Sequence, residues 1–154
     1  MDVTISEADS RDVPAMAALL GELFTIENDF QPEPEKQARG LRLILSRPEL
    51  GRLFVLRDRG RVVGMANALF TVSTAEGGPV VLLEDVIVGK DYRGRGLGQR
   101  LVDYVLDWAR REGYLRVTLL VDQANTRVFS FYERLGFARS AMVAYRQALA
   151  VSTA

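Results

Sequence analysis

Between residues 86 and 101 the chain passes from an apolar run, through a glycine-rich turn, straight into an amphipathic pattern. Glycine occupies positions 94, 96 and 98. It permits a positive φ and a close approach of backbone to ligand, and the first N–H groups of a following helix have no internal partner. Arg93, Arg95 and Arg100 add positive charge. The run predicts a strand that leads through an anion-binding turn into a helix; a plain surface turn is the alternative.

The spacing of these glycines limits which phosphate compound the turn fits. A Walker loop requires Gly-Lys-Ser or Gly-Lys-Thr, which this turn lacks. A dinucleotide fingerprint that begins at Gly94 or Gly96 requires glycine or alanine at 99 or 101, where Gln99 and Leu101 stand. Both nucleotide interpretations are therefore disfavoured.

Composition bounds the class of protein. With 154 residues, 48% of them hydrophobic, we expect one core and a single domain over residues 1–154. Twenty Lys and Arg balance twenty Asp and Glu, so no overall field favours nucleic acid or an anionic membrane. The absence of Cys and His excludes disulfides, the usual soft metal sites and Ser-His or Cys-His nucleophiles, so we expect no metal. Residues 1–7 carry no targeting pattern, and we expect a cytoplasmic location.

Hydrophobic periodicity and turn residues predict an α/β fold, with Asp12 as the N-cap of the first helix. The order of elements predicts a mixed, mostly antiparallel central sheet with helices on both faces. Helices are expected at 13–24, 35–45, 97–112 and 125–135. Strands are expected at 3–5, 53–56, 62–70, 80–88 and 115–121, with terminal strands that include 142–145.

Two motifs resemble one family. Arg93-x-x-Gly96-x-Gly98 resembles the acyl-coenzyme A pyrophosphate loop of the GNAT acetyltransferase superfamily, Arg/Gln-x-x-Gly-x-Gly/Ala. Residues 125–137 resemble its second motif, Asn-x-x-Ala-x-x-Phe-Tyr-x-x-x-Gly-Phe, with Val128 in place of the small Ala near the cofactor channel. The chain is identified as a member of this superfamily, closely over residues 80–137 and by order of elements over 1–75. The resemblance implies the GNAT fold.

The resemblance also implies acetyl-CoA (coenzyme A) as co-substrate, with the pyrophosphate on the glycine turn and the pantetheine arm paired along the strand before it. Asn125 would add a hydrogen bond to the cofactor, although an N-cap role alone would explain this residue. Val86 and Val88 are also expected to belong to the core. The implied cofactor-binding residues are Val86, Ile87, Val88, Arg93, Gly94, Arg95, Gly96, Leu97, Gly98, Gln99, Asn125, Phe129 and Tyr132.

Amide formation from an amine requires a proton acceptor, because an alkyl ammonium with a pKa of about 10.4 is charged at neutral pH. Freeing its lone pair costs roughly 4 to 5 kcal/mol. Strand alternation predicts Glu84 on the face of Val86 and Val88 and Asp85 on the opposite face, so only one would face the amine. The resemblance implies Glu84 as general base. There are two alternatives. Asp85 is the general base, or both carboxylates only bind nearby backbone or arginine groups.

The leaving thiolate requires a proton donor. A phenol with a pKa near 10 can protonate a thiolate whose conjugate acid lies near 8.5, an uphill step of about 2 kcal/mol. The resemblance to the family's Phe-Tyr pair implies Tyr132 as general acid. A buried structural tyrosine is the alternative.

Family members build the acceptor site from the first two helices and their connection. In this chain, acids and aromatics alternate there, at Phe24, Glu27, Asp29 and Phe30, and an acidic rim would attract a cationic amine. A solvated helix end with two core aromatics is the alternative. We expect these four residues and Glu84 to bind the acceptor.

The function implied is an N-acetyltransferase that acts on a primary amine, foremost that of a small molecule. A peptide or protein amine acetyltransferase, a non-catalytic acyl-CoA sensor and a nucleotide-binding regulatory domain are the alternatives, the last disfavoured by the glycine spacing. We expect neither nucleic acid nor membrane as a partner. Dimers are common in the family, which leaves a homodimer open.

Overall fold

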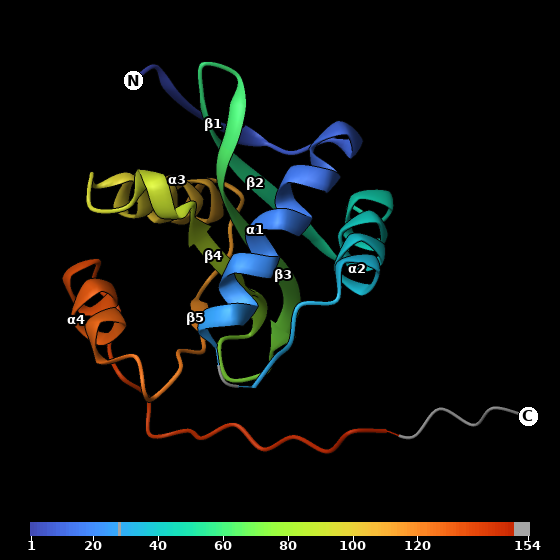
Figure 1. Cartoon of the computed structure of the whole chain (residues 1–154). Helices are drawn as coiled ribbons and strands as arrows, with labels where there is room; N and C mark the ends of the chain where they lie inside the picture. Colours follow the sequence, from blue (N-terminus) through green and yellow to red (C-terminus); the bar gives the residue numbers. More distant parts are fainter. Residues whose placement is uncertain (28, 150–154) are drawn as a thin grey trace, which may run out of the picture. The chain divides into compact units, whose positions relative to one another are not determined.

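The structure is a computed structural model that describes residues 1–27 and 29–149 (Figure 1). Met1–Asp122 form one compact unit, and Gln123–Ala154 form a second, of which residues 123–149 are described. Each unit is treated by itself below. Within the described ranges, the structure contains no helix that is both long and apolar enough to cross a membrane.

The first unit is built on a five-stranded sheet in which the strands follow one another in chain order. The first four pair antiparallel; short turns join the second to the third and the third to the fourth, and two helices stand between the first and the second. The fifth runs parallel to the fourth after a helical crossover. The expected mixed, mostly antiparallel sheet is confirmed. The strands are β1 (Val3–Glu7), β2 (Gly51–Asp58), β3 (Arg61–Ser73), β4 (Gly78–Val88) and β5 (Val117–Leu119).

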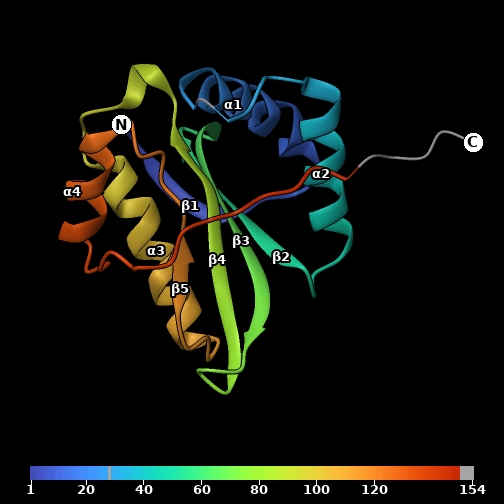
Figure 2. The same ribbon diagram turned by 90° about the horizontal axis from the view of Figure 1, so that it is seen from below.

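Helices cover both faces of this sheet, as expected (Figure 2). Helices α1 (Val13–Ile26) and α2 (Pro34–Ser46) lie on one face, and α3 (Leu97–Arg111) lies on the other. Single-turn helices precede α1 and α3 at η1 (Ser10–Asp12) and η2 (Lys90–Tyr92).

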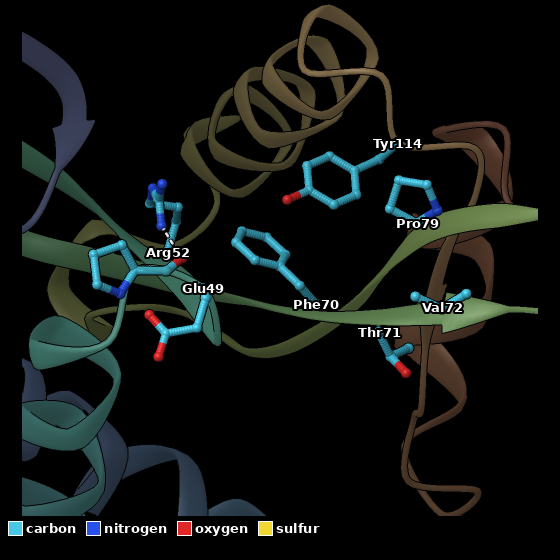
Figure 3. Close-up of a pocket in the computed structure, with 8 residues that line it drawn as sticks. Glu49, Arg52, Phe70, Thr71, Val72, Pro79 and Tyr114 are labelled. Atoms are coloured by element: carbon cyan, nitrogen blue, oxygen red, sulfur yellow. Dashed lines mark hydrogen bonds between the residues drawn. The ribbon is translucent and has the colours of Figure 1, made fainter.

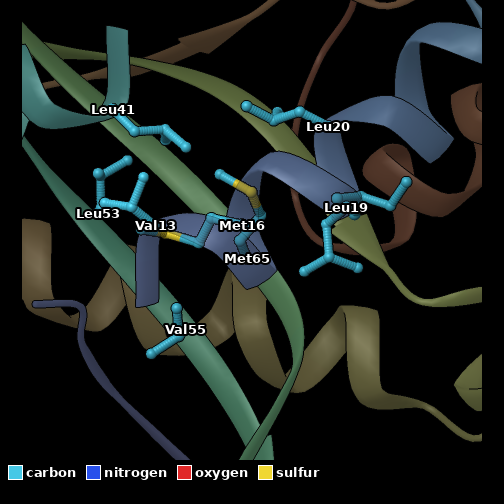
Figure 4. Packing of buried hydrophobic residues seen from close by; sticks show 9 residues of the cluster. Val13, Met16, Leu19, Leu20, Leu41, Leu53, Val55 and Met65 are labelled. Carbon is cyan, nitrogen blue, oxygen red and sulfur yellow. The ribbon is translucent and has the colours of Figure 1, made fainter. Parts of the chain in front are cut away.

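Side chains alternate along a strand, so odd-numbered and even-numbered residues of β2 and β3 point to opposite faces of the sheet. Each set fills the hydrophobic core on its own face. On the α1 and α2 face a buried cluster joins both helices to the sheet (Figure 4). On the α3 face Phe54 contacts Trp108 edge to face, with ring centroids 5.2 Å apart. The first cluster consists of Val13, Met16, Leu19, Leu20, Leu41, Leu53, Val55, Met65 and Ile87.

The start of α1 differs from the expected cap. Asp12 stands at the N-cap position, yet its carboxylate accepts two hydrogen bonds of 2.8 Å from Arg57 and one from the Asp9 backbone N–H. Asp9, not Asp12, provides the capping side chain, for the single turn that precedes α1. The buried carboxylate of Asp12 therefore ties the start of α1 to β2, and Arg57 lowers its pKa.

The second unit contains helix α4 (Thr126–Arg134), close to the expected 125–135. Residues 138–149, all described, form no strand, so the expected terminal strands around 142–145 are wrong. Strands require a hydrogen-bonded partner, and β5 is only three residues long where 115–121 was expected. Met142, Val143 and Tyr145 are exposed in consequence.

Candidate active site

The glycine turn has the geometry of an anion-binding loop. Gly94 and Gly96 adopt φ angles of 77° and 74°, and Gly96 is the N-cap of α3. A Cβ built on either glycine meets no atom within 4 Å in the part of the chain that the structure describes, so the space in front of the turn is open. Gly98 already lies inside α3 and is not among the glycines with a positive φ. The first N–H groups of α3 have no partner within the helix, as at any helix start, and groups of this kind can bind an anion.

Two arginines of the turn have different surroundings. The Arg93 guanidinium donates to the Val88 carbonyl at 2.8 Å and to the Glu22 carboxylate at 3.4 Å, so it ties the turn to β4 and α1. Glu22 also accepts from the Lys90 backbone N–H at 3.3 Å. The Arg95 guanidinium lies 5.5 Å from the Tyr92 ring centroid and is exposed. Arg95 is thus the more available positive charge, and Arg93 is foremost an anchor.

The strand that leads into the turn has one open edge. β5 pairs with β4 only at residues 81–83, and no other strand of the described chain covers residues 84–88 on that side. The edge of residues 86–88 thus has no neighbouring strand on that side, and an edge of this kind can pair with a ligand that lies along it. The side chain of Ile87 belongs to the buried cluster, so only its backbone is available, and the carbonyl of Val88 is shared with Arg93.

A β-bulge interrupts β4 at the carboxylate pair. Met65 pairs with Ile87 and Asn67 with Glu84, so Asp85 and Val86 together oppose one residue of β3. Asp85 adopts a φ of 55°, a left-handed conformation that is rare outside glycine.

The bulge overturns the expected arrangement of faces. Paired residues on neighbouring strands point to the same side, so Glu84 shares a face with Asn67, and Ile87 with Met65. Met65 and Ile87 both lie in the cluster under α1 and α2. Glu84 therefore points to the α1 and α2 face and not to the face of Val86 and Val88, because the extra residue shifts the alternation.

Asp85 reaches the same face as Glu84. Its carboxylate accepts a 3.1 Å hydrogen bond from the amide nitrogen of Asn67. Burial raises the pKa of Asp85, and this hydrogen bond opposes the shift. The expectation that Glu84 and Asp85 lie on opposite faces is wrong, because the left-handed conformation of Asp85 turns its carboxylate to the face of Asn67 and Glu84.

The end of α1 brings further acids to this face. Glu27 follows α1 directly, and burial raises its pKa, with further contributions from the negative charges of neighbouring carboxylates. We call these residues together the acidic cluster: Glu27, Asp29, Glu84, Asp85 and Asp122. Of the expected acceptor residues, Asp29 and Glu84 thus lie near enough to Glu27 for their charges to raise its pKa.

The two aromatics of the expected acceptor site stand beside the cluster. The rings of Phe24 and Phe30 are 5.3 Å apart and tilted. Phe24 packs against the buried core, and Phe30 is 41% exposed. They form an apolar wall at the end of α1, with one ring anchored and the other open to solvent.

Asn67 and Asp122 were not among the expected site residues. Asn67 is buried, only 4% exposed, within a strand whose neighbours are almost all apolar. A single amide in an apolar run was the available signal, because a buried polar side chain requires a partner. Asp122 directly follows the expected strand at 115–121, and no local signal distinguishes it.

Tyr132, Phe129 and Asn125 belong to the second unit, whereas Glu84 belongs to the first. The Tyr132 ring contacts Phe131 and Phe137 edge to face, with centroids 5.0 and 5.6 Å apart. Tyr132 is half-buried, not a core residue. Asn125 is the N-cap residue of α4, but its side chain makes no capping hydrogen bond within residues 123–149, so a capping role does not account for it.

The first unit also has a surface pocket of about 500 Å³ (Figure 3). Phe70 and Tyr114 stack in its wall, with ring centroids 4.8 Å apart, and the Arg52 guanidinium lies 5.7 Å from the Phe70 ring. Its lining includes none of the expected site residues. Among the described residues, no group of three or more Asp, Glu, His or Cys is arranged to hold a metal ion.

Comparison with known proteins agrees with this geometry. The sequence profile of the Acetyltransferase (GNAT) family matches residues 14–137. Glucosamine 6-phosphate N-acetyltransferase of Trypanosoma brucei brucei is 34% identical over 87 residues, which cover 56% of this chain and 57% of that protein. The chain spans about half the length of the curated relatives it matches.

Solved structures share the fold. A possible acetyltransferase from Clostridium difficile 630 superposes with a TM-score of 0.88 at 20% identity, over 98% of this chain and 100% of that one. A predicted acetyltransferase from Clostridium acetobutylicum, solved with acetyl-CoA, has a TM-score of 0.77 at 14% identity, over 94% and 96% of the two chains. With the family profile covering most of its length, the chain belongs to the acetyltransferase (GNAT) family.

Proposed function

We propose that the protein is an acetyl-CoA-dependent N-acetyltransferase that acts on the primary amine of a small cationic molecule. The observation that carries this proposal is the bulge in β4, which turns Glu84 and Asp85 to one face beside Glu27. The same strand leads into the anion-binding turn at Gly96. A proton acceptor and a phosphate site thus lie on one continuous segment, as transfer from a nucleotide thioester to an amine requires.

The turn and the open edge of β4 are the proposed binding site for acetyl-CoA. The backbone N–H groups at the start of α3 hold the pyrophosphate, supported by Arg95, and Arg93 fixes the turn through Val88. The edge of residues 86–88 pairs with the amides of the pantetheine arm. The open space in front of Gly94 and Gly96 supports this assignment. When bound, acetyl-CoA supplies the acetyl group in an activated form, as a thioester.

Glu84 is the proposed proton acceptor for the amine. The acceptor arrives as an ammonium and becomes nucleophilic once a proton passes from its nitrogen to the carboxylate, directly or through a water molecule. Asp85 is less suited to this task, because its oxygen is engaged by Asn67 in a buried hydrogen bond. Its charge instead contributes to the attraction of the cation.

Tyr132 is the proposed proton donor. Its place in the Phe131-Tyr132 pair of the family's second motif supports this role, and the family match at residues 14–137 includes it. Its Oη holds the proton that the departing sulfur requires, so the reaction ends with a thiol and an amide. The match runs across both compact units, which supports the further proposal that residues 1–154 act as one domain.

The acidic cluster supports a small cationic acceptor. The T. brucei brucei relative is named for a phosphorylated sugar amine. In this chain, the charges of four other carboxylates act on Glu27 at the end of α1, and such a concentration of negative charge would repel a phosphate. A polyamine-like or amino-compound acceptor fits this charge better than a sugar phosphate.

The proposed function is tested by release of free thiol from acetyl-CoA across a panel of amines, with the acetylated product identified by mass spectrometry. Transfer to small amines that requires both Glu84 and Tyr132 supports the proposal. Transfer only to peptides would assign the protein-amine alternative. Coenzyme A binding without transfer to any amine would assign the non-catalytic sensor.

A further inference from the structure

The side-chain oxygen of Asn67 lacks a hydrogen-bond partner among the residues that the structure describes. The residue is 4% exposed, and its amide nitrogen donates to Asp85 at 3.1 Å. A carboxylate accepts hydrogen bonds, so this contact fixes the orientation of the amide and leaves the oxygen as an unused acceptor. A buried acceptor without a donor is costly unless a ligand supplies one.

Further acceptors lie on the same face of the sheet as Asn67. Asn67 points to the α1 and α2 face together with Glu84, and Asp85 is bonded to it directly. Glu27 lies in the same cluster, where Asp85 is the first of the charges that act on it. An amide oxygen and two carboxylates match the three N–H donors of one ammonium group.

An ammonium held in this way is not the group that reacts. Acceptors and negative charges around an ammonium stabilise its charged form and raise its pKa, whereas the attacking amine must lose its proton. Two different amine groups are therefore required, one near Glu84 that reacts and one that stays charged.

We propose that Glu27, Asp85 and the side-chain oxygen of Asn67 form a subsite for a second, non-reacting ammonium group, so that the acceptor is a short diamine. This inference rests on the proposed function, because it divides the acceptor site into a reacting and an anchoring part. It makes Asn67 a positioning residue: its nitrogen orients Asp85 and its oxygen binds the acceptor.

Calorimetry with the full chain and coenzyme A present tests the subsite without turnover. The probes are α,ω-diaminoalkanes with two to six carbons, each compared with the n-alkylamine of the same length. We expect at least one diamine to bind about 10- to 100-fold more tightly than its monoamine, the range for hydrogen bonds to a charged group. Equal affinity of every diamine and its monoamine, or no binding of any diamine, would overturn the inference.

Glu27→Gln removes one charge of the subsite, and Glu112→Gln is its matched control, since both glutamates are C-cap residues, of α1 and α3. We expect Glu27→Gln to abolish most of the preference for the diamine, by raising its KM about 10-fold with little change in kcat, and Glu112→Gln to leave the preference intact. Asn67→Leu should act like Glu27→Gln. If Asn67→Leu fails to fold, Glu27→Gln alone decides, and an unchanged preference in that variant would refute the subsite.

The outcomes separate this inference from the proposed function. Transfer to monoamines as efficient as transfer to diamines would leave the acetyltransferase proposal standing and remove the subsite. Tight diamine binding without transfer to any amine would leave the subsite standing and remove the proposed function.

Discussion

Substitution of Gly96 by Asp is expected to have two effects that can be measured separately, a lower Tm and a weaker Kd for coenzyme A. Gly96 has a φ of 74°, and a left-handed conformation costs a residue with a Cβ about 1 to 2 kcal/mol. The added Cβ meets no described atom within 4 Å, so no clash adds to this cost. A loss of this size lowers Tm by about 2 to 8 °C in a domain of this length and leaves the protein folded at 25 °C.

The effect on coenzyme A is larger. A carboxylate about 5 Å from a phosphate charge repels it by about 1 kcal/mol at the dielectric constant of water and by about 3 kcal/mol at an effective value near 20. The turn is exposed, so we expect about 2 kcal/mol, or about a 30-fold weaker Kd. The effect should shrink at high salt, because a charge in an exposed turn is screened.

Gly113→Asp is the matched control. Gly113 has a φ of 84° just beyond the other end of α3, and a Cβ there also meets no described atom within 4 Å. It should lower Tm by a similar amount and leave the Kd for coenzyme A unchanged, as measured by calorimetry. A folded Gly96→Asp variant with the wild-type Kd would refute the anion-binding assignment of the turn.

Three further variants test the proposed chemistry. Glu84→Gln should reduce kcat about 10²- to 10⁴-fold near neutral pH, with partial recovery as the pH approaches the amine pKa of about 10.4; an unchanged pH profile would exclude Glu84 as the base. Asp85→Asn should raise Tm at neutral pH, because burial raises the pKa of this carboxyl and its charge opposes folding above that pKa. This gain should disappear as the pH falls toward the ordinary value of about 3.9, and a lower Tm at neutral pH would contradict it. Tyr132→Phe should retain Tm and coenzyme A affinity and lose about 10²- to 10⁴-fold in kcat, whereas wild-type turnover would leave the hydroxyl without a catalytic role.

The elements set by local pattern could be predicted from the sequence. Apolar residues of α3 repeat at helical spacing: Leu97, Leu101 and Val105 are buried, whereas Asp103 and Asp107 are exposed. Gly113 ends the helix with a positive φ, as a C-terminal glycine does. In such segments neighbouring residues all favour the same secondary structure, so the element can be predicted without knowledge of distant contacts.

The site required information that no local pattern holds. Alternation along residues 84–88 predicts a regular strand, and the bulge exists only as a mismatch in register with β3. Asp85 in a left-handed conformation contradicts its strand-forming neighbours, and Asn67, which holds it, is 18 residues away in the chain. The sequence pattern identified the carboxylate pair and missed that both face the same side.

The remaining differences between the expected and the observed strands depend on pairing between distant segments of the chain. β5 is three residues long although residues 115–121 are mostly apolar, and residues 142–145 form no strand although they are apolar too. β-propensity describes how well a residue fits a pleated, half-buried surface, so it cannot supply the neighbouring strand. A short strand that leaves part of β4 unpaired is what gives the proposed cofactor site its open edge.

The most direct test of the account is acetyl transfer itself, measured as thiol release from acetyl-CoA with the wild-type chain, Glu84→Gln and Glu112→Gln across short diamines and monoamines. We predict release that depends on the amine, a product that is heavier by one acetyl group, a preference for diamines, and a loss of activity in Glu84→Gln but not in Glu112→Gln. Release that is the same with and without any amine, or equal in all three proteins, would contradict the claim that these carboxylates serve an amine acceptor.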